Sequence, residues 1–184
     1  VESTECVKKG MHMTKNGKNT PLNSTLQHNM DMVEKQILRC AVVGVGRMGK
    51  HHARVYAQME GAELVGVVDQ SQDRRQEVTE ERGGHGFDSV EALLELGVDA
   101  VTIATPTVYH LEAAAPLLEA GIACLIEKPL APTAEVAATI ADITEASGAV
   151  LQVGHVVRYD PVMRAIASIE NLKPRFIEMT RISP

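Results

Sequence analysis

The stretch that decides the fold is Ile37-Leu38-Arg39-Cys40-Ala41-Val42-Val43-Gly44-Val45-Gly46-Arg47-Met48-Gly49. An apolar run leads directly into a Gly-x-Gly-x-x-Gly sequence, and a helix-like segment follows it. This context predicts a buried strand, a tight glycine turn and a helix that packs back on the strand. Without the flanking elements, the same glycines would equally fit an ordinary glycine-rich turn.

Each glycine of this turn has its own predicted task. Gly44 permits the sharp turn, Gly46 leaves the backbone open to a pyrophosphate, and Gly49 lets helix and strand pack closely. The backbone amides at the helix start, at Arg47 and Met48, point toward the same position, and the helix dipole favours an anion there. The turn therefore predicts a dinucleotide-binding site.

Apolar runs and helix-like segments alternate along the chain, which is typical of βαβ units with a parallel sheet. The runs predicted as strands are 37–43, 62–69, 86–87, 98–105, 122–127 and 149–154. The segments predicted as helices between them are 47–60, 72–82, 90–96, 108–120 and 134–147. Asp88 has the spacing of a capping-box N-cap, and Gly121 and Gly148 stand at predicted helix ends. The predicted fold class is α/β, with a Rossmann-type doubly wound parallel sheet.

The chain is expected to contain one whole domain and only the start of a second α/β domain. Residues 1–36 show neither helical nor strand periodicity, so we expect a mobile tail there. Residues 37–156 are predicted to form the NAD(P)-binding Rossmann domain. Residues 157–184 are interpreted as a connector, with a helix at 161–169 and a first strand of the truncated substrate domain at 175–182.

An acidic residue, Asp69, ends the second predicted strand 20 residues after Gly49. A carboxylate at this place accepts hydrogen bonds from the adenosine ribose and repels a 2′-phosphate, which favours NAD over NADP. Arg74 and Arg75 keep the opposite preference open, because they could reach a phosphate from the following helix. Their other interpretation is that of solvated helix charges.

The fourth predicted strand ends in Ala104-Thr105-Pro106-Thr107. Open α/β sheets bind ligands at the carboxyl ends of their strands, so Thr105 and Pro106 are either cofactor contacts or simple strand-to-helix punctuation. His110 lies one helical turn later and faces either the cofactor or solvent. His51 and His52 are adjacent and cannot share one helix face, so no metal site is predicted.

Charged residues also follow the fifth and sixth predicted strands. Glu127 and Lys128 form a Glu-Lys-Pro sequence, and His155 and Arg158 come after Gly154. A lysine partly desolvated beside the positive nicotinamide ring is suited to exchange a proton with a substrate hydroxyl. A direct ion pair with Glu127 would oppose the loss of the lysine's proton, so a ribose-binding role for Glu127 is the more consistent one. The alternatives are an exposed loop ion pair and, for His155 and Arg158, a domain connector.

Composition excludes several classes of protein. The 184 residues include 18 Lys+Arg and 24 Asp+Glu, a net charge of -6 with no basic cluster, so a nucleic-acid partner is not expected. We find neither a secretory signal nor a stretch approaching the ~18 apolar residues of a membrane helix. Cys6, Cys40 and Cys124 share no Cys-x-x-Cys spacing, which indicates a reducing, cytoplasmic location.

Five motifs together resemble the glucose-fructose oxidoreductase / inositol dehydrogenase / MocA (Gfo/Idh/MocA) family. They are Gly44-x-Gly46-x-x-Gly49-x-x-His52, Asp69, Ala104-Thr105-Pro106-Thr107-x-x-His110, Glu127-Lys128-Pro129 and Gly154-His155-x-x-Arg158-Tyr159-x-Pro161. Their order and spacing are specific, and the resemblance extends from about residue 37 to the end of the chain. The last motif is most similar to the nucleotide-sugar branch, such as UDP-N-acetylglucosamine 3-dehydrogenases.

The resemblance implies an NAD-dependent oxidoreductase that transfers hydride between nicotinamide and a secondary alcohol of a sugar, nucleotide sugar or cyclitol. Lys128 would be the catalytic lysine, and Glu127 and the Thr105-Pro106 loop would line the cofactor site. The family's second domain supplies most substrate contacts and the sheet through which homo-oligomers form, so residues 1–184 alone are not expected to be active. The alternatives are a non-catalytic dinucleotide or sugar sensor and a reductase of a non-sugar carbonyl.

Overall fold

The computed structural model describes residues 11–13, 19–21, 37–169, 171, 173, 175, 176 and 178. Its strands are β1 (Met11–Met13), β2 (Asn19–Pro21), β3 (Leu38–Val43), β4 (Ala62–Val68), β5 (His85–Phe87), β6 (Ala100–Ile103), β7 (Ala123–Ile126) and β8 (Leu151–Val153). Its α-helices are α2 (Arg47–Gln58), α3 (Gln72–Arg82), α4 (Glu91–Leu96), α5 (His110–Glu119), α6 (Ala134–Ser147) and α7 (Pro161–Ala167). Two 3₁₀ helices are η2 (Thr107–Tyr109) and η3 (Val156–Tyr159).

Six strands form one parallel sheet in the order β5-β4-β3-β6-β7-β8. This arrangement confirms the predicted Rossmann-type doubly wound sheet. The chain runs outward from β3 to β5 and then returns to β6, so β3 and β6 are neighbours at the point where the strand order reverses. The carboxyl ends of β3 and β6 meet at Val43 and Ile103, which is where open α/β sheets form a ligand crevice.

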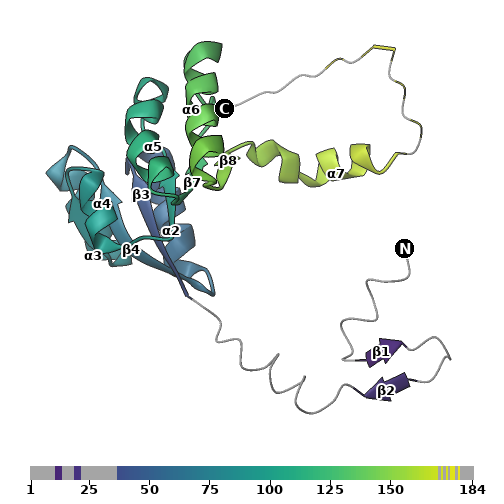
Figure 1. Ribbon diagram of the computed structural model, residues 1–184, viewed down its shortest axis with the longest axis horizontal. Coiled ribbons are helices and arrows are strands. Elements are labelled where there is room, and N and C mark those ends of the chain that lie inside the picture. The colour runs from purple at the N-terminus through teal and green to yellow at the C-terminus, as the bar shows by residue number, and fades with distance from the viewer. Residues whose placement is uncertain are drawn as a thin grey trace.

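Helices cover both faces of the sheet. Ala53 of α2 and Val78 of α3 pack with buried residues of β3 and β4 on one face. Leu93 of α4, Leu117 of α5 and Ile140 of α6 belong to the larger core on the other face, where Figure 1 shows α5 and α6 side by side. The central strands are therefore buried on both sides, which explains their nearly continuous apolar sequences.

The predicted elements of the sheet and its helices are present. Five of the six strands are shorter than predicted, and β5 is one residue longer. The strand predicted at 98–105 is β6, Ala100–Ile103. Residues 98–99 and 104–105 belong to the loops before and after it. The predicted capping box is wrong: the N-cap of α4 is Val90 in a helical conformation, without a side-chain cap. Gly148 is the C-cap of α6 as predicted, whereas the C-cap of α5 is Ala120, one residue before Gly121.

The two ends of the chain differ from the expectations in part. Within residues 1–36, β1 and β2 pair antiparallel, as two short strands that the sequence pattern did not predict. The rest of 1–36 lies outside the described residues. The predicted helix at 161–169 is α7, capped by Asp160. In the predicted strand 175–182, the described residues Arg175, Phe176 and Glu178 are not in a strand, and the others lie outside the description.

Candidate functional site

The glycine turn between β3 and α2 requires glycine at two positions for steric reasons. Gly44 has a φ of +84°, and a Cβ there would lie 2.8 Å from the backbone nitrogen of Thr105. A Cβ on Gly49 would lie 1.8 Å from the carbonyl oxygen of Gly44. Neither position accepts a larger residue unless the backbone moves, so the fold itself requires both glycines.

Gly46 differs from the other two glycines because nothing in the fold requires it. A Cβ at Gly46 would meet no atom within 4 Å. The residue is the N-cap of α2 and gives the first helical turn no side-chain cap, so the amides near Arg47 and Met48 remain open at the positive end of the helix dipole. An anionic ligand fits this opening.

The carboxylate of Asp69 ties the glycine turn to the start of α3. Its Oδ2 accepts a hydrogen bond from the Val45 amide at 3.0 Å, and its Oδ1 accepts one from the Ser71 amide at 2.9 Å. The side chain is 9% exposed, directly after β4. Each oxygen keeps a lone pair for a second donor, so Asp69 can still accept a hydrogen bond from a ligand hydroxyl.

The two arginines that followed Asp69 in the sequence have different environments. Arg75 donates from Nη1 to the backbone carbonyl oxygen of Asp69, so its guanidinium is held by the protein. The Arg74 guanidinium lies 3.7 Å from Asp69 Oδ1 and its side chain is 57% exposed. Only Arg74 of the pair lines the cleft described next.

A cleft of about 810 Å³ follows the carboxyl edge of the sheet. Seven predicted site residues line it: Gly44, Gly46, Arg47, Met48, Asp69, Thr105 and Pro106. The sequence motifs did not identify Ser71, Tyr109, Glu112 or the segment Asp88–Glu91, which line it as well. All of these residues follow the carboxyl end of β4, β5 or β6, and this position was the signal that could have identified them.

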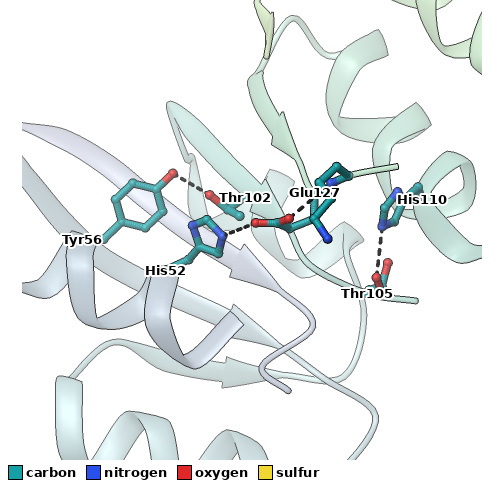
Figure 2. A network of polar contacts seen from close by, with 7 residues as sticks. His52, Tyr56, Thr102, Thr105, His110 and Glu127 are labelled. Carbon is teal, nitrogen blue, oxygen red and sulfur yellow. Dashed lines mark hydrogen bonds and ion pairs between the residues drawn. The ribbon is translucent and has the colours of Figure 1, made fainter. Parts of the chain in front are cut away.

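His110 faces neither the cofactor cleft nor solvent, which corrects both predicted orientations. It is 1% exposed, with Nε2 3.0 Å from the carbonyl oxygen of Thr105 and Nδ1 3.1 Å from that of Leu130. Figure 2 shows the imidazole directed at Thr105. The Thr105 hydroxyl is buried and has no hydrogen-bond partner in the described part of the chain.

Glu127 pairs with a histidine and not with its neighbour's ammonium group. Its Oε1 lies 2.9 Å from His52 Nε2 (Figure 2). Its Oε2 accepts the backbone N–H of Lys128 at 3.2 Å. The Glu127 side chain is only 10% exposed. The loop ion pair between the Glu127 and Lys128 side chains is therefore wrong. His52 could have been identified as a partner of this site from the sequence, because it lies one helical turn after Gly49.

Lys128, His155 and Arg158 lie outside the cleft. The Lys128 side chain is exposed just after β7 and makes no hydrogen bond or ion pair with any residue that the structure describes. His155 and Arg158 are exposed at and within η3, after β8. The structure thus gathers the glycine turn, Asp69 and the Thr105 loop in one cleft, and places these three farther along the sheet.

A second polar pair fixes α2 against the sheet. The Tyr56 hydroxyl and the fully buried Thr102 hydroxyl are 2.7 Å apart (Figure 2). Burial raises the pKa of Tyr56, which keeps its hydroxyl neutral. Tyr56 and His52 are four residues apart and share one face of α2. The helix that begins at the glycine turn is therefore attached to β6 and to the end of β7.

Two buried thiols, Cys40 and Cys124, are chemically inert in this environment. Burial raises the pKa of Cys124 to about 12, and burial followed by the charge of Asp99 raises the pKa of Cys40. Within the described residues, no group of three or more His, Cys, Asp or Glu side chains gathers as metal ligands would. No helix of that same part is long and apolar enough to cross a membrane.

Known proteins resemble this chain in sequence and in fold. A profile of the Gfo/Idh/MocA family, an oxidoreductase family with an NAD-binding Rossmann fold, matches residues 38–155. UDP-N-acetylglucosamine 3-dehydrogenase from Acidithiobacillus ferrooxidans is 37% identical over 147 residues, which are 80% of the chain and 46% of that protein. scyllo-Inositol 2-dehydrogenase (NAD⁺) from Bacillus subtilis is 36% identical over 132 residues, 70% of the chain and 38% of that protein.

A solved structure, GenD2 from gentamicin A biosynthesis in complex with NAD, is 33% identical with a TM-score of 0.68. The match covers 72% of the chain and 39% of GenD2. The chain thus spans less than half the length of these relatives. The family match and the parallel sheet with its open glycine turn show that the chain belongs to the Gfo/Idh/MocA oxidoreductase family, with residues 38–155 as its NAD-binding Rossmann domain.

Proposed function

We propose that the chain is the cofactor-binding part of an NAD-dependent dehydrogenase that transfers hydride between nicotinamide and a secondary alcohol. The observation that carries this proposal is the opening at Gly46, where an uncapped helix start faces a cleft shared with Asp69. The names of two relatives, a UDP-N-acetylglucosamine dehydrogenase and a scyllo-inositol dehydrogenase, support a sugar, nucleotide sugar or cyclitol as substrate.

The residues of the cleft fit the adenosine and diphosphate parts of NAD. The open amides near Arg47 and Met48 would bind the diphosphate, because Gly46 leaves the approach free. Asp69 would accept a hydrogen bond from the adenosine ribose with the lone pairs that Val45 and Ser71 leave unused. The Thr105 residue lines the same cleft, so its loop would border the bound ligand.

The same arrangement supports NAD over NADP. Two backbone amides fix the Asp69 carboxylate, so it cannot turn away from a 2′-phosphate on the ribose that it binds. The negative charge of Asp69 would repel such a phosphate. The Arg74 guanidinium, which could offset the phosphate charge, lies 3.7 Å from the Asp69 carboxylate and already pairs with it. The Arg74 and Arg75 alternative is therefore the weaker one, since Arg75 is bonded to the backbone.

Lys128 would accept and return the proton of the substrate hydroxyl in this reaction. Bound NAD would supply the hydride acceptor, at the carbon para to the ring nitrogen of nicotinamide. Lys128 Nζ has no partner in the described chain, so it is available to the nicotinamide ribose and to the substrate hydroxyl. As the neutral amine it accepts the proton that the hydroxyl loses, and as the ammonium it returns that proton in the reverse direction. His155 and Arg158 would contact polar groups of the substrate.

Calorimetric titration of the chain with NAD and NADP tests the cofactor part of the proposal, with tighter binding of NAD expected. To test turnover, residues 1–155 are fused to the part of the A. ferrooxidans relative that follows the counterpart of residue 155. NADH formation with UDP-sugars, inositols and hexoses should be lost in Lys128→Ala and retained in His51→Ala, which alters an exposed residue of α2. If the chain binds NAD but neither the chain nor the fusion shows turnover, the dinucleotide sensor is favoured. If the chain does not bind NAD, the proposal is overturned.

A further inference from the structure

The position of Lys128 depends on the backbone segment that carries it. Its side chain is exposed and has no partner in the described chain, so nothing on the side chain itself fixes Nζ. Two histidines contact the segment 127–130 from different helices. His52 of α2 reaches it at Glu127, and His110 of α5 reaches it at Leu130.

The contact through Glu127 is confined on several sides. His52 Nε2 and Glu127 Oε1 are 2.9 Å apart, and both side chains are largely buried. The other oxygen accepts the Lys128 amide, so the carboxylate links His52 to the Lys128 backbone. A Cβ on Gly154 would lie 3.2 Å from the Glu127 carboxyl carbon, which means that the carboxylate fills the space beside Gly154, just after β8. Glu127 therefore has little room to shift.

The contact through Leu130 is made by the His110 imidazole, which also contacts the Thr105 loop. His110 is buried, and its two nitrogens face the carbonyl oxygens of Thr105 and Leu130. A neutral imidazole has one N–H donor and bonds one of these carbonyls, whereas the imidazolium bonds both. Thr105 lines the dinucleotide cleft, so His110 connects the cleft to the segment that carries Lys128.

Each histidine comes shortly after a turn that lines the cleft. His52 follows Gly46 by six residues, and His110 follows Pro106 by four. We propose that His52, acting through Glu127, and His110, acting through Leu130, are positioning residues that hold Lys128 at a fixed place relative to the dinucleotide cleft. The proposal rests on the proposed contact between Lys128 and the nicotinamide ribose.

The test compares the dissociation constants of NAD and ADP for the chain by calorimetry. ADP occupies only the part of the cleft near Gly46 and Asp69, whereas NAD also extends to Lys128. Lys128→Ala should raise the ratio of the NAD to the ADP constant by about tenfold, and His52→Ala and His110→Ala by a similar factor. In a Lys128→Ala background, His52→Ala should add nothing further to the ratio, because it acts through Lys128.

Two variants separate positioning from general loosening of the domain. His52→Gln should restore the wild-type ratio, because its amide N–H can reach the Glu127 carboxylate. His51→Ala removes an exposed neighbour on α2 and should change neither constant. A loosened domain would weaken NAD and ADP equally and leave the ratio unchanged, which would contradict the proposal.

The outcomes also separate this inference from the proposed function. A ratio raised by Lys128→Ala but not by either histidine variant overturns the positioning role and leaves Lys128 as a cofactor contact. A ratio unchanged in Lys128→Ala overturns that contact. Amide hydrogen exchange over 127–130 in the ligand-free chain then decides the positioning role. Acceleration of about tenfold in His52→Ala and His110→Ala relative to His51→Ala supports it, and unchanged exchange refutes it.

Discussion

Replacing Gly46 by valine should remove dinucleotide binding and leave the fold intact. Gly46 has a φ of -68°, which any residue adopts, and an added Cβ meets no atom within 4 Å. Substitutions away from packed or strained sites change the free energy of unfolding by about 0.5 kcal/mol or less. The midpoint of urea unfolding should therefore remain close to that of the wild type.

The loss of affinity follows from what the valine side chain occupies. It fills the approach to the uncapped amides of α2, where the diphosphate would accept its hydrogen bonds. A hydrogen bond to a charged group contributes about 1.5–3 kcal/mol, and the diphosphate would lose at least one or two. A total near 3 kcal/mol corresponds to a rise in the dissociation constant of NAD of more than about hundredfold.

Gly49→Ala is the matched opposite case. Its Cβ would lie 1.8 Å from the Gly44 carbonyl oxygen, whereas ordinary van der Waals contact begins at 3.4 Å, so the turn must move. Alanine improves helix propensity by up to about 1 kcal/mol, and overpacking of this severity costs about 3 kcal/mol or more. The free energy of unfolding should fall by about 2 kcal/mol or more.

Calorimetry with NAD and urea unfolding followed by circular dichroism measure both variants. The reasoning is refuted if Gly46→Val loses helical dichroism together with NAD binding, because the glycine would then be structural. Retention of wild-type NAD affinity by Gly46→Val would refute it as well, because the diphosphate would not lie over residue 46. Unchanged stability of Gly49→Ala would show that the turn relaxes without cost.

Four further predictions concern single side chains. Asp69→Asn should reduce the preference for NAD over NADP by about tenfold in calorimetry, since the carboxylate charge that repels a 2′-phosphate is gone; an unchanged preference would assign the discrimination elsewhere. Cys40 and Cys124 should resist iodoacetamide at pH 8 until urea is added, as peptide mass spectrometry will show. Because the pKa of Cys124 rises from 9.0 to about 12 on folding, the unfolded chain loses this proton first, so stability should be unaffected below about pH 8 and decline between pH 9 and 12; Cys124→Ala should flatten that decline. Tyr56→Phe leaves the buried Thr102 hydroxyl unpaired and should lower the free energy of unfolding by about 1–2 kcal/mol.

The fold was predictable because its signals are local. The buried residues of β3, Cys40–Val43, are apolar on both faces, and this property of a parallel strand is visible in the sequence. The capping box failed at Asp88 because spacing alone does not fix the backbone conformation. The helix begins after Val90, which is itself helical and has no side-chain cap.

The glycine turn and Asp69 were predictable for a similar reason, since each depends on a short sequence beside a strand. The orientation of His110 had a signal that was not used. His110, Ala113, Ala114 and Leu117 are all buried and follow the helical spacing of one apolar stripe, which places the histidine in the core. The contact between His52 and Glu127 joins residues 75 positions apart, and strand order brings them together. A single sequence carries no direct signal for such a pair.

Strand order also explains why the cleft holds one part of the predicted site and leaves Lys128 outside. Asp69 follows β4, Gly44 follows β3, Thr105 follows β6 and Lys128 follows β7, so these residues lie in that order along one edge of the sheet. Neighbouring strands are about 4.8 Å apart, so three intervals separate Asp69 from Lys128 by roughly 14 Å. A ligand that contacts both must therefore extend across four strand ends, with its diphosphate over the turn at Gly46. An ADP-sized ligand ends before Lys128, which is why the difference between NAD and ADP binding reports on the lysine.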